Sequence, residues 1–190
     1  GFGDSSVVTF EVIEEPSADF TVSSASICTD SCITFAYAGT VLGPTQSFLW
    51  DFGPGAVPQT SSLPFPPCVE YVTGGVKTVT LTVTYRGCVV STSQNVHVIA
   101  GPLVTAGTDR EYCDGTGGVE LDGSVSGGTQ PYFYTWTCDN PPNCGIQNPN
   151  SEDPFVNPDI VAATESHEFY FQVVDVNGCA SNIDTVVVTT

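Results

Sequence analysis

The chain contains an approximate internal repeat, in which the same order of short segments occurs twice. Each copy has a cysteine ahead of an alternating segment, then an aromatic segment with a tryptophan, a long alternating segment, a Gly-Cys step and a final alternating segment. The first copy places these features at Cys28, 33–35, 48–52, 77–83 and 87–99, and the second at Cys113, 119–121, 132–136, 168–174 and 178–189. A repeat of this kind indicates two similar structural units in tandem.

The joint between the copies is the step Gly101-Pro102, which makes a short and rather stiff connection. We therefore predict one domain over residues 16–100 and a second over residues 101–190. Residues 1–15 do not fit the first copy. The segment 9–13 resembles the final strand of a unit, which favours the last strand of a preceding domain. A first strand or linker belonging to this sandwich is the alternative.

Apolar side chains alternate with polar ones in the strand period of two, for example at 79–83, 169–173 and 186–188. No segment shows a convincing helical period, and 19 glycines and 14 prolines interrupt any long helical pattern. A length of 190 residues suits two sandwiches, since an immunoglobulin-like domain has about 100 residues. We predict an all-β fold of two tandem immunoglobulin-like β-sandwiches that contain disulfides.

The charge balance is strongly acidic, because 21 Asp and Glu against three Lys and Arg give a formal net charge of −18. Binding of nucleic acid needs cationic side chains to neutralise phosphates, so we exclude nucleic acid as a partner. The same balance opposes attraction to anionic lipid. No apolar run reaches the ~18 residues that would span a bilayer, so we expect no direct membrane insertion.

The eight cysteines lack the paired spacing and the histidine partners of a zinc site. They indicate disulfides and therefore an oxidising compartment, so we expect an extracellular or cell-surface location. The chain also has no methionine and no apolar signal segment. These absences favour a processed chain or a piece of a longer protein.

The first copy carries a resemblance to a known family. Its segment 50–55 (Trp-Asp-Phe-Gly-Pro-Gly), followed by Tyr71 and the segment 74–83, resembles the polycystic-kidney-disease (PKD) domain. The hallmark of that family is Trp-Asp-Phe-Gly-Asp-Gly with a downstream Tyr…Gly…Tyr-Thr-Val-Thr-Leu strand. Pro54 stands where the hallmark has its second Asp, so no role of that Asp is carried over.

The second copy is similar to the related immunoglobulin-like repeats of large Bacteroidetes adhesins and gliding proteins. The resemblance lies in its segments 106–109, 121–124, 134–136 and 177–179, and in Cys113. Together the two resemblances cover nearly the whole chain from about Pro16. They imply an extracellular spacer or adhesive repeat in a multidomain protein, although a sandwich fold by itself does not specify a function.

Each copy holds four cysteines, and four cysteines allow three connectivities. We expect pairing within each copy, with the long segment of each copy closed by the cysteines near its two ends. The expected pairs are Cys28–Cys88, Cys32–Cys68, Cys113–Cys179 and Cys138–Cys144. Closing such a long loop would stabilise a domain by about 4 kcal/mol in the chain-entropy model.

Aromatic side chains in the repeated strands are the candidate core. Trp50 and Trp136 lie in the segment that crosses the centre of a sandwich, so we expect them in the core and not in a sugar-stacking role. The other candidate core residues are Phe52, Tyr71, Phe169 and Phe171. The three aromatics at 132–134 cannot all point inward, because neighbours in a strand alternate faces. Phe133 is therefore a candidate exposed aromatic that a neighbouring domain or subunit would cover.

Catalytic motifs are weak in this sequence. His97 and His167 belong to no paired metal-binding motif, and there is no Gly-x-Ser-x-Gly elbow or phosphate-binding glycine loop with a lysine. We predict no enzyme active site and no required cofactor. Calcium is the cofactor that the composition leaves open, because Asp109, Glu111 and Asp122 flank the start of the second domain near the joint. Scattered surface acids are the alternative interpretation.

These expectations together predict a non-catalytic structural or adhesive segment of a long extracellular surface protein or filament. Its partners would be neighbouring domains of the same chain and, in fibres, further copies. Self-assembly would require that uncharged aromatic and Val/Thr surfaces outweigh the repulsion between acidic copies, or that cations screen it. The alternative function is a carbohydrate-binding or spacer module of a secreted multidomain hydrolase. A cluster of exposed aromatics with convergent amides would favour the carbohydrate-binding function.

Overall fold

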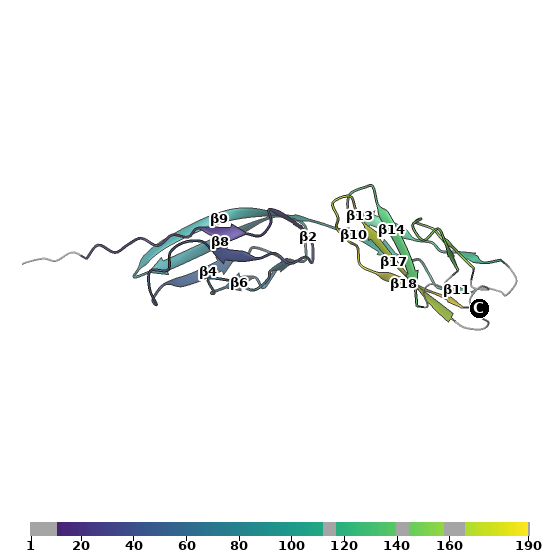
Figure 1. Ribbon diagram of the computed structural model, residues 1–190, viewed down its shortest axis with the longest axis horizontal. Helices are drawn as coiled ribbons and strands as arrows, with labels where there is room; N and C mark the ends of the chain where they lie inside the picture. Colours follow the sequence, from purple (N-terminus) through teal and green to yellow (C-terminus); the bar gives the residue numbers. More distant parts are fainter. Residues whose placement is uncertain (1–10, 112–116, 140–144, 158–165, 190) are drawn as a thin grey trace, which may run out of the picture. The chain divides into compact units, whose positions relative to one another are not determined.

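The structure is a computed structural model that describes residues 11–111, 117–139, 145–157 and 166–189 (Figure 1). These residues form strands connected by turns and loops, and none of them is helical. Over the described part of the chain there is accordingly no helix long and apolar enough to cross a membrane.

The chain divides into two compact units. The first comprises Gly1–Val72 and Val76–His97, and the second comprises Thr73–Gly75 and Val98–Thr190. Each unit has its own sheets and its own buried core. The fold class is therefore the predicted one, all-β with two immunoglobulin-like sandwiches in tandem.

Strands β1 to β9 build the first unit. Their bounds are β1 (Phe20–Val22), β2 (Ser26–Cys28), β3 (Phe35–Tyr37), β4 (Ser47–Asp51), β5 (Ala56–Val57), β6 (Thr60–Ser61), β7 (Glu70–Tyr71), β8 (Gly75–Tyr85) and β9 (Cys88–Ile99). Five of them form one sheet in the order β2-β9-β8-β4-β6, while β1 pairs with β3 and β5 pairs with β7. The long alternating segments predicted from the sequence are the two central strands of the large sheet.

A tight turn at Arg86 and Gly87 joins β8 to β9. Both residues have positive φ, 47° and 87° respectively. A two-residue hairpin turn with positive φ at both positions matches the right-handed twist of the strands it connects. Because glycine adopts this conformation without steric cost, the Arg-Gly step brings the two longest strands of the unit side by side.

The first core lies between the large sheet and the short strand pairs. Trp50 of β4 is fully buried and contacts Phe20 of β1 and Phe52, with ring centroids 5.1 and 5.8 Å away. Its indole N–H donates to the carbonyl of Leu63 at 2.7 Å, so the buried polar atom is satisfied. Tyr71 is also buried and donates its hydroxyl to the carbonyl of Phe52 at 2.8 Å.

Strands β10 to β18 build the second unit. Their bounds are β10 (Pro102–Thr105), β11 (Arg110–Glu111), β12 (Val119–Glu120), β13 (Ser124–Gly127), β14 (Phe133–Cys138), β15 (Ile146–Gln147), β16 (Phe155–Val156), β17 (Ser166–Val174) and β18 (Asp184–Thr189). The main sheet has the order β11-β18-β17-β14, and it is accompanied by the sheets β10-β13 and β12-β16-β15. Strand β11 runs parallel to β18, and the other pairs in the main sheet are antiparallel.

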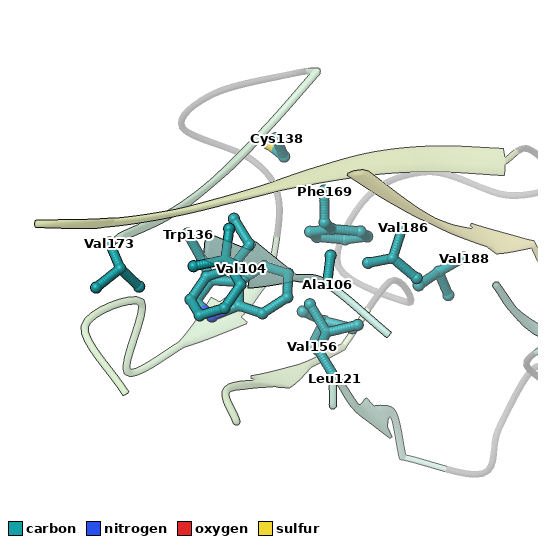
Figure 2. Close-up of a cluster of buried hydrophobic side chains, with 11 residues drawn as sticks. Val104, Ala106, Leu121, Trp136, Cys138, Val156, Phe169, Val173, Val186 and Val188 are labelled. Atoms are coloured by element: carbon teal, nitrogen blue, oxygen red, sulfur yellow. The ribbon is translucent and has the colours of Figure 1, made fainter. Parts of the chain in front are cut away.

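The second core is shown in Figure 2, where side chains from the main sheet meet those of the smaller sheets. Trp136 stacks on Phe171 with ring centroids 4.4 Å apart, and these two residues are opposite each other in β14 and β17. The indole N–H of Trp136 donates to the carbonyl of Glu152 at 3.1 Å. The tryptophan of each unit therefore has the same role, a buried ring whose N–H is bound by a loop carbonyl.

The segment ahead of the first sandwich begins with residues 1–10, which lie outside the described residues. Residues 11–19 form no strand. Glu11 accepts a hydrogen bond from Arg86 at the tip of the β8–β9 hairpin, at 2.6 Å, as an exposed ion pair. The origin of residues 1–15 as the last strand of a preceding domain stays a prediction.

Candidate functional site

The face of the large sheet that points away from the first core is the most regular surface of the first unit. In β8 the buried residues Val79, Leu81 and Val83 alternate with threonines, because neighbours in a strand point to opposite faces. We call the outward surface of β4, β8 and β9 the first outer face. Its β8 contribution is Thr78, Thr80, Thr82 and Thr84.

Hydrogen bonds between side chains run along the first outer face from β8 to β9. They join Thr78 Oγ1 to Asn95 Oδ1 (3.0 Å), Thr80 Oγ1 to Ser93 Oγ (2.8 Å) and Thr82 Oγ1 to Ser91 Oγ (2.8 Å). All three pairs are exposed to solvent. We call these six residues the hydroxyl ladder. Such cross-strand pairs stabilise a sheet and also hold the side chains in one arrangement.

Two large apolar side chains flank the ladder. Leu49 of β4 is opposite Thr82 and is 57% exposed. Val89 of β9 is 61% exposed and lies two residues before Ser91 on the same side of its strand. The first outer face therefore combines hydroxyl groups with a margin of exposed aliphatic carbon.

The second unit has an equivalent face on β14, β17 and β18, which we call the second outer face. Trp136 is opposite Phe171 in this sheet just as Trp50 is opposite Leu81 in the first, so the outward residues correspond position by position. Phe133 belongs to this face, is opposite Val174 and is 60% exposed, as the alternation predicted. That a neighbouring domain or subunit covers Phe133 stays a prediction.

Charge is nearly absent from both outer faces. Among the acidic residues that the structure describes, only Asp51 and Glu168 lie on the outward side of the strands of these faces, and Asp139 directly follows β14, where its N–H donates to the carbonyl of Glu168. Asp51 accepts a hydrogen bond from the N–H of Gly53 at 2.9 Å, and Glu168 accepts one from the hydroxyl of Tyr170 at 2.7 Å. In a chain with a formal net charge of −18, two equivalent faces with so few carboxylates are a distinct feature.

The six candidate core aromatics are all buried. Trp50, Phe52, Tyr71 and Phe171 have no exposed surface, and Phe169 and Trp136 are 1% and 2% exposed. Their rings contribute to packing between the layers of each sandwich and are inaccessible to a sugar. Burial, and next the negative charge of Asp51, raise the pKa of Tyr71 to about 12.

The disulfides differ in part from the expected set. Cys32 and Cys68 are bonded to each other, 36 residues apart in the sequence. The sulfurs of Cys28, Cys138 and Cys179 are also in disulfides. Cys113 and Cys144, which were expected as partners of Cys179 and Cys138, lie outside the described residues.

The expected Cys28–Cys88 bond is wrong, because Cys88 has a free thiol. Strand β2 reaches β9 near its far end, where the N–H of His97 donates to the carbonyl of Ala25. His97 lies nine residues beyond Cys88, about 30 Å along a strand. The three residues from Ala25 to Cys28 span at most ~10 Å, so Cys28 cannot come within the Cα separation of ~4.4–6.8 Å that a disulfide requires.

The three candidate calcium ligands make contacts within the second unit. Asp109 Oδ1 accepts from the N–H of Val187 at 2.9 Å, and Asp122 forms an exposed ion pair with Arg110 at 3.7 Å. Glu111 is an exposed residue of the edge strand β11. Within the described ranges no group of three or more His, Cys, Asp or Glu side chains is placed to hold a metal ion. Calcium binding stays a prediction without a site in the structure.

A surface depression of about 380 Å³ lies beside these acids. Its lining residues are Arg110, Val119, Glu120, Leu121, Asp122 and Asp153. The only cation of this lining is already paired with Asp122, and no lining residue is a cysteine, serine or histidine nucleophile. The depression therefore offers a mixed polar surface.

Asp175 is a structural residue that the sequence analysis missed. Its carboxylate is buried in the turn between β17 and β18 and accepts hydrogen bonds from the N–H groups of Cys179 and Asn177 at 2.9 Å and of Thr129 at 3.0 Å. Burial by itself would raise the pKa of the Asp175 carboxyl, but these hydrogen bonds outweigh burial and lower it. An aspartate directly ahead of the turn sequence Val-Asn-Gly was the available signal.

Comparisons of the sequence with known proteins give no family. No family model matches the chain. No curated protein matches it either. The PKD and adhesin resemblances therefore stay predictions from the motifs quoted above.

Solved structures give matches at low identity. The chain is similar to fibronectin(III)-like modules of Clostridium thermocellum CbhA (13% identity, 90% of this chain and 94% of that chain, TM-score 0.33). It is also similar to carbohydrate-binding modules from the β-sandwich superfamily (17%, 84% and 57%, 0.41) and to invasin, a bacterial integrin-binding protein (15%, 90% and 38%, 0.37). No functional conclusion follows from similarities of this size.

Proposed function

We propose that this chain is a non-catalytic structural repeat segment of an extracellular surface protein. The observation that carries the proposal is the repetition of one surface in both units. Each sandwich presents a face with few charged side chains, rich in Thr and Ser or aromatic side chains, on equivalent strands of its main sheet. Repeated units with equivalent surfaces are typical of proteins whose function depends on reach and on many weak contacts.

The charge distribution supports this function. Dense negative charge on the remaining surface keeps copies soluble and opposes unspecific association. A face with few charges is then the part of the molecule where a neighbour approaches with the least repulsion. The Cys32–Cys68 disulfide supports folding in an oxidising compartment, which agrees with an extracellular location.

The test is immunogold electron microscopy of the source cells with an antibody raised against this chain, with the culture supernatant examined in parallel. Gold label along surface fibres or on the cell envelope is the expected result. Label restricted to a soluble enzyme fraction would overturn the proposal and would favour an accessory module of a secreted hydrolase.

A second candidate function is binding of a neutral carbohydrate on the second outer face. The observation in its favour is that Phe133 and Tyr170 belong to this face. Gln172, which is opposite Thr135, lies in the cross-strand pair between the pair that contains Phe133 and the pair that contains Tyr170. Exposed rings supply stacking surface for sugars, and an amide supplies both donors and an acceptor. This arrangement is the cluster of aromatics with an amide that the sequence analysis named as the discriminating feature.

Affinity gel electrophoresis against neutral polysaccharides tests the second candidate. If the face binds sugar, a polysaccharide will retard the chain and Phe133→Ala will abolish the retardation. Phe65→Ala is the matched control, because Phe65 is 67% exposed in the first unit and is not on either outer face. Equal mobility of the chain with and without every polysaccharide would remove this candidate.

A further inference from the structure

We propose that the first outer face is a contact surface for a second copy of this chain, and that two copies meet there face to face. This inference rests on the proposed function as a structural repeat and names its partner. The contact uses the hydroxyl ladder at its centre and Leu49 and Val89 at its margin.

The low charge of the first outer face favours contact between two copies there. Two copies with a formal net charge of −18 repel each other over most of their described surface. On the first outer face the only carboxylate is Asp51, which is at the end of β4 and already accepts the N–H of Gly53. No lysine or arginine of the described residues belongs to this face, since Lys77 is buried and Arg86 is in the hairpin turn. Contact here therefore buries almost no charge.

The hydrogen-bonding groups of the first outer face favour an identical partner. A hydroxyl is both a donor and an acceptor, so a surface of Thr and Ser is complementary to an identical surface. In each Thr–Ser pair of the ladder one hydroxyl donates to the other, and the second hydroxyl keeps its own hydrogen for a partner. A surface of one charge sign does not have this property. Such a face fits a twofold contact between identical copies. In a twofold contact the same surface is used by both copies, so that residue i of one copy contacts residue j of the other and the reverse contact also forms.

The side chains of the hydroxyl ladder are already ordered in a single copy. The three cross-strand bonds hold the ladder side chains in place before any contact forms. Five of the six residues are Ser or Thr, and the three threonines, Thr78, Thr80 and Thr82, have stiff branched side chains. Association through pre-ordered short side chains loses less conformational entropy than association through long flexible ones.

The size of the face sets the expected strength. Three strands spaced ~4.8 Å apart, with about four outward residues spaced ~6.6 Å along β8 and β9 and about three along β4, give a footprint of roughly 350 Å² per copy. Stable dimers bury about 800 Å² per partner, so a single contact of this size is weak. Weak contact is what a repeat needs, because a protein with several such faces gains strength from their number and remains reversible at each one.

The experiment is a concentration series of the ¹⁵N-labelled full chain, from roughly 20 µM to roughly 1 mM, with amide spectra recorded at low and at high NaCl. The expected result is a concentration-dependent shift of the amides of β4, β8 and β9, with Thr82 and Ser91 among the largest. Higher salt will increase the shift at a given concentration, because it screens the repulsion between the copies.

Three variants make the result specific. Ser91→Asp places a carboxylate in the ladder of both copies and should weaken association at least about tenfold, since like charges meet across the contact. Thr45→Asp is the matched control, because it adds the same charge in the exposed turn ahead of β4 and should leave association unchanged. Ser91→Lys reduces the net negative charge, so unspecific repulsion falls, yet it should also weaken association because two lysines then meet at one contact.

Several results would overturn the inference. These are the absence of any concentration-dependent shift at ~1 mM in high salt, shifts confined to the second unit, equal effects of Ser91→Asp and Thr45→Asp, or stronger association of Ser91→Lys. Shifts of the same amides on addition of a neutral oligosaccharide, without concentration dependence of the chain alone, would assign the face to a glycan instead. Fibre labelling by immunogold without self-association would leave the proposed function intact and remove only this partner.

Discussion

The turn that joins β17 to β18 depends on the single carboxylate of Asp175, and replacing that carboxylate tests the structural reasoning most directly. Oδ1 accepts the N–H groups of Asn177 and Cys179, and Oδ2 accepts the N–H of Thr129. The turn therefore ties the β17–β18 connection to the loop ahead of β14 through one side chain.

The magnitude follows from the number of donors that lose their acceptor. A buried N–H group without a partner costs about 1–3 kcal/mol, and the lower end applies here because Thr129 and Asn177 are at the surface. Asp175→Ala removes the acceptors of all three N–H groups and should destabilise the second unit by about 3 kcal/mol. Asp175→Asn keeps one oxygen for the N–H groups of Asn177 and Cys179 and loses the bond to the Thr129 N–H and the long bond to the Asn177 side-chain amide, so about 1–2 kcal/mol is expected.

The assay is urea unfolding of the full chain followed by pulsed hydrogen exchange and mass spectrometry. Peptides from β14, β17 and β18 report the second unit, and peptides from β4 and β8 report the first unit in the same sample. Only the urea midpoint of the second unit should shift. It should be lowest for Asp175→Ala, intermediate for Asp175→Asn and highest for the wild type. Glu120→Gln, at an exposed position of the same unit, is the control and should leave both midpoints unchanged.

The reasoning would be refuted if Asp175→Asn cost as much as Asp175→Ala, since the two bonds that Oδ1 accepts from Asn177 and Cys179 would then contribute nothing beyond the bond that Oδ2 accepts from Thr129. It would also fail if both variants unfolded at the wild-type midpoint. A simultaneous shift of the first unit would show that the turn stabilises more than the unit that contains it.

Three further predictions address pH and cross-linking. The lowered pKa of Asp175 stabilises the second unit at pH values above the ordinary aspartate pKa of 3.8, and this stabilisation is lost as the pH falls through the lower pKa of the folded state. Acid titration of the second unit should show this loss, and Asp175→Asn should lack it. The raised pKa of Tyr71 predicts one tyrosinate that forms near pH 12 in the folded chain, with stability lost as the pH rises toward that value; absorbance at alkaline pH should show this step in the wild type and not in Tyr71→Phe. Replacing Cys32 and Cys68 by serine opens a loop of 36 residues and should cost the first unit about 4 kcal/mol in urea unfolding, with the second unit as the unchanged reference.

Local patterns gave the fold class and much of the core assignment. Alternation in β8 and β17 reports which side chains face the core, because the period of two is a property of each strand alone. The segment around Trp50 and its repeat around Trp136 identified the strand that carries the buried tryptophan of each core for the same reason. The alternation also predicted that Phe133 would be exposed.

Features that depend on pairing between distant segments could not be predicted in this way. The register of β2 against β9 leaves the thiol of Cys88 free, although the repeat made Cys28 its expected partner. Asp175 was passed over because its bond to Thr129 links residues 46 positions apart. In both cases the residue types were visible in the sequence and their neighbours were not.

The sequence by itself determined that this chain forms two all-β units of one kind, each with a central buried tryptophan, because alternation and repetition are local properties. Only the tertiary structure decided that Leu49, Thr82 and Ser91 share one row of a face with few charges. Strand order and register are set by packing between segments far apart in the chain, and a surface that three strands assemble exists only once that packing is complete.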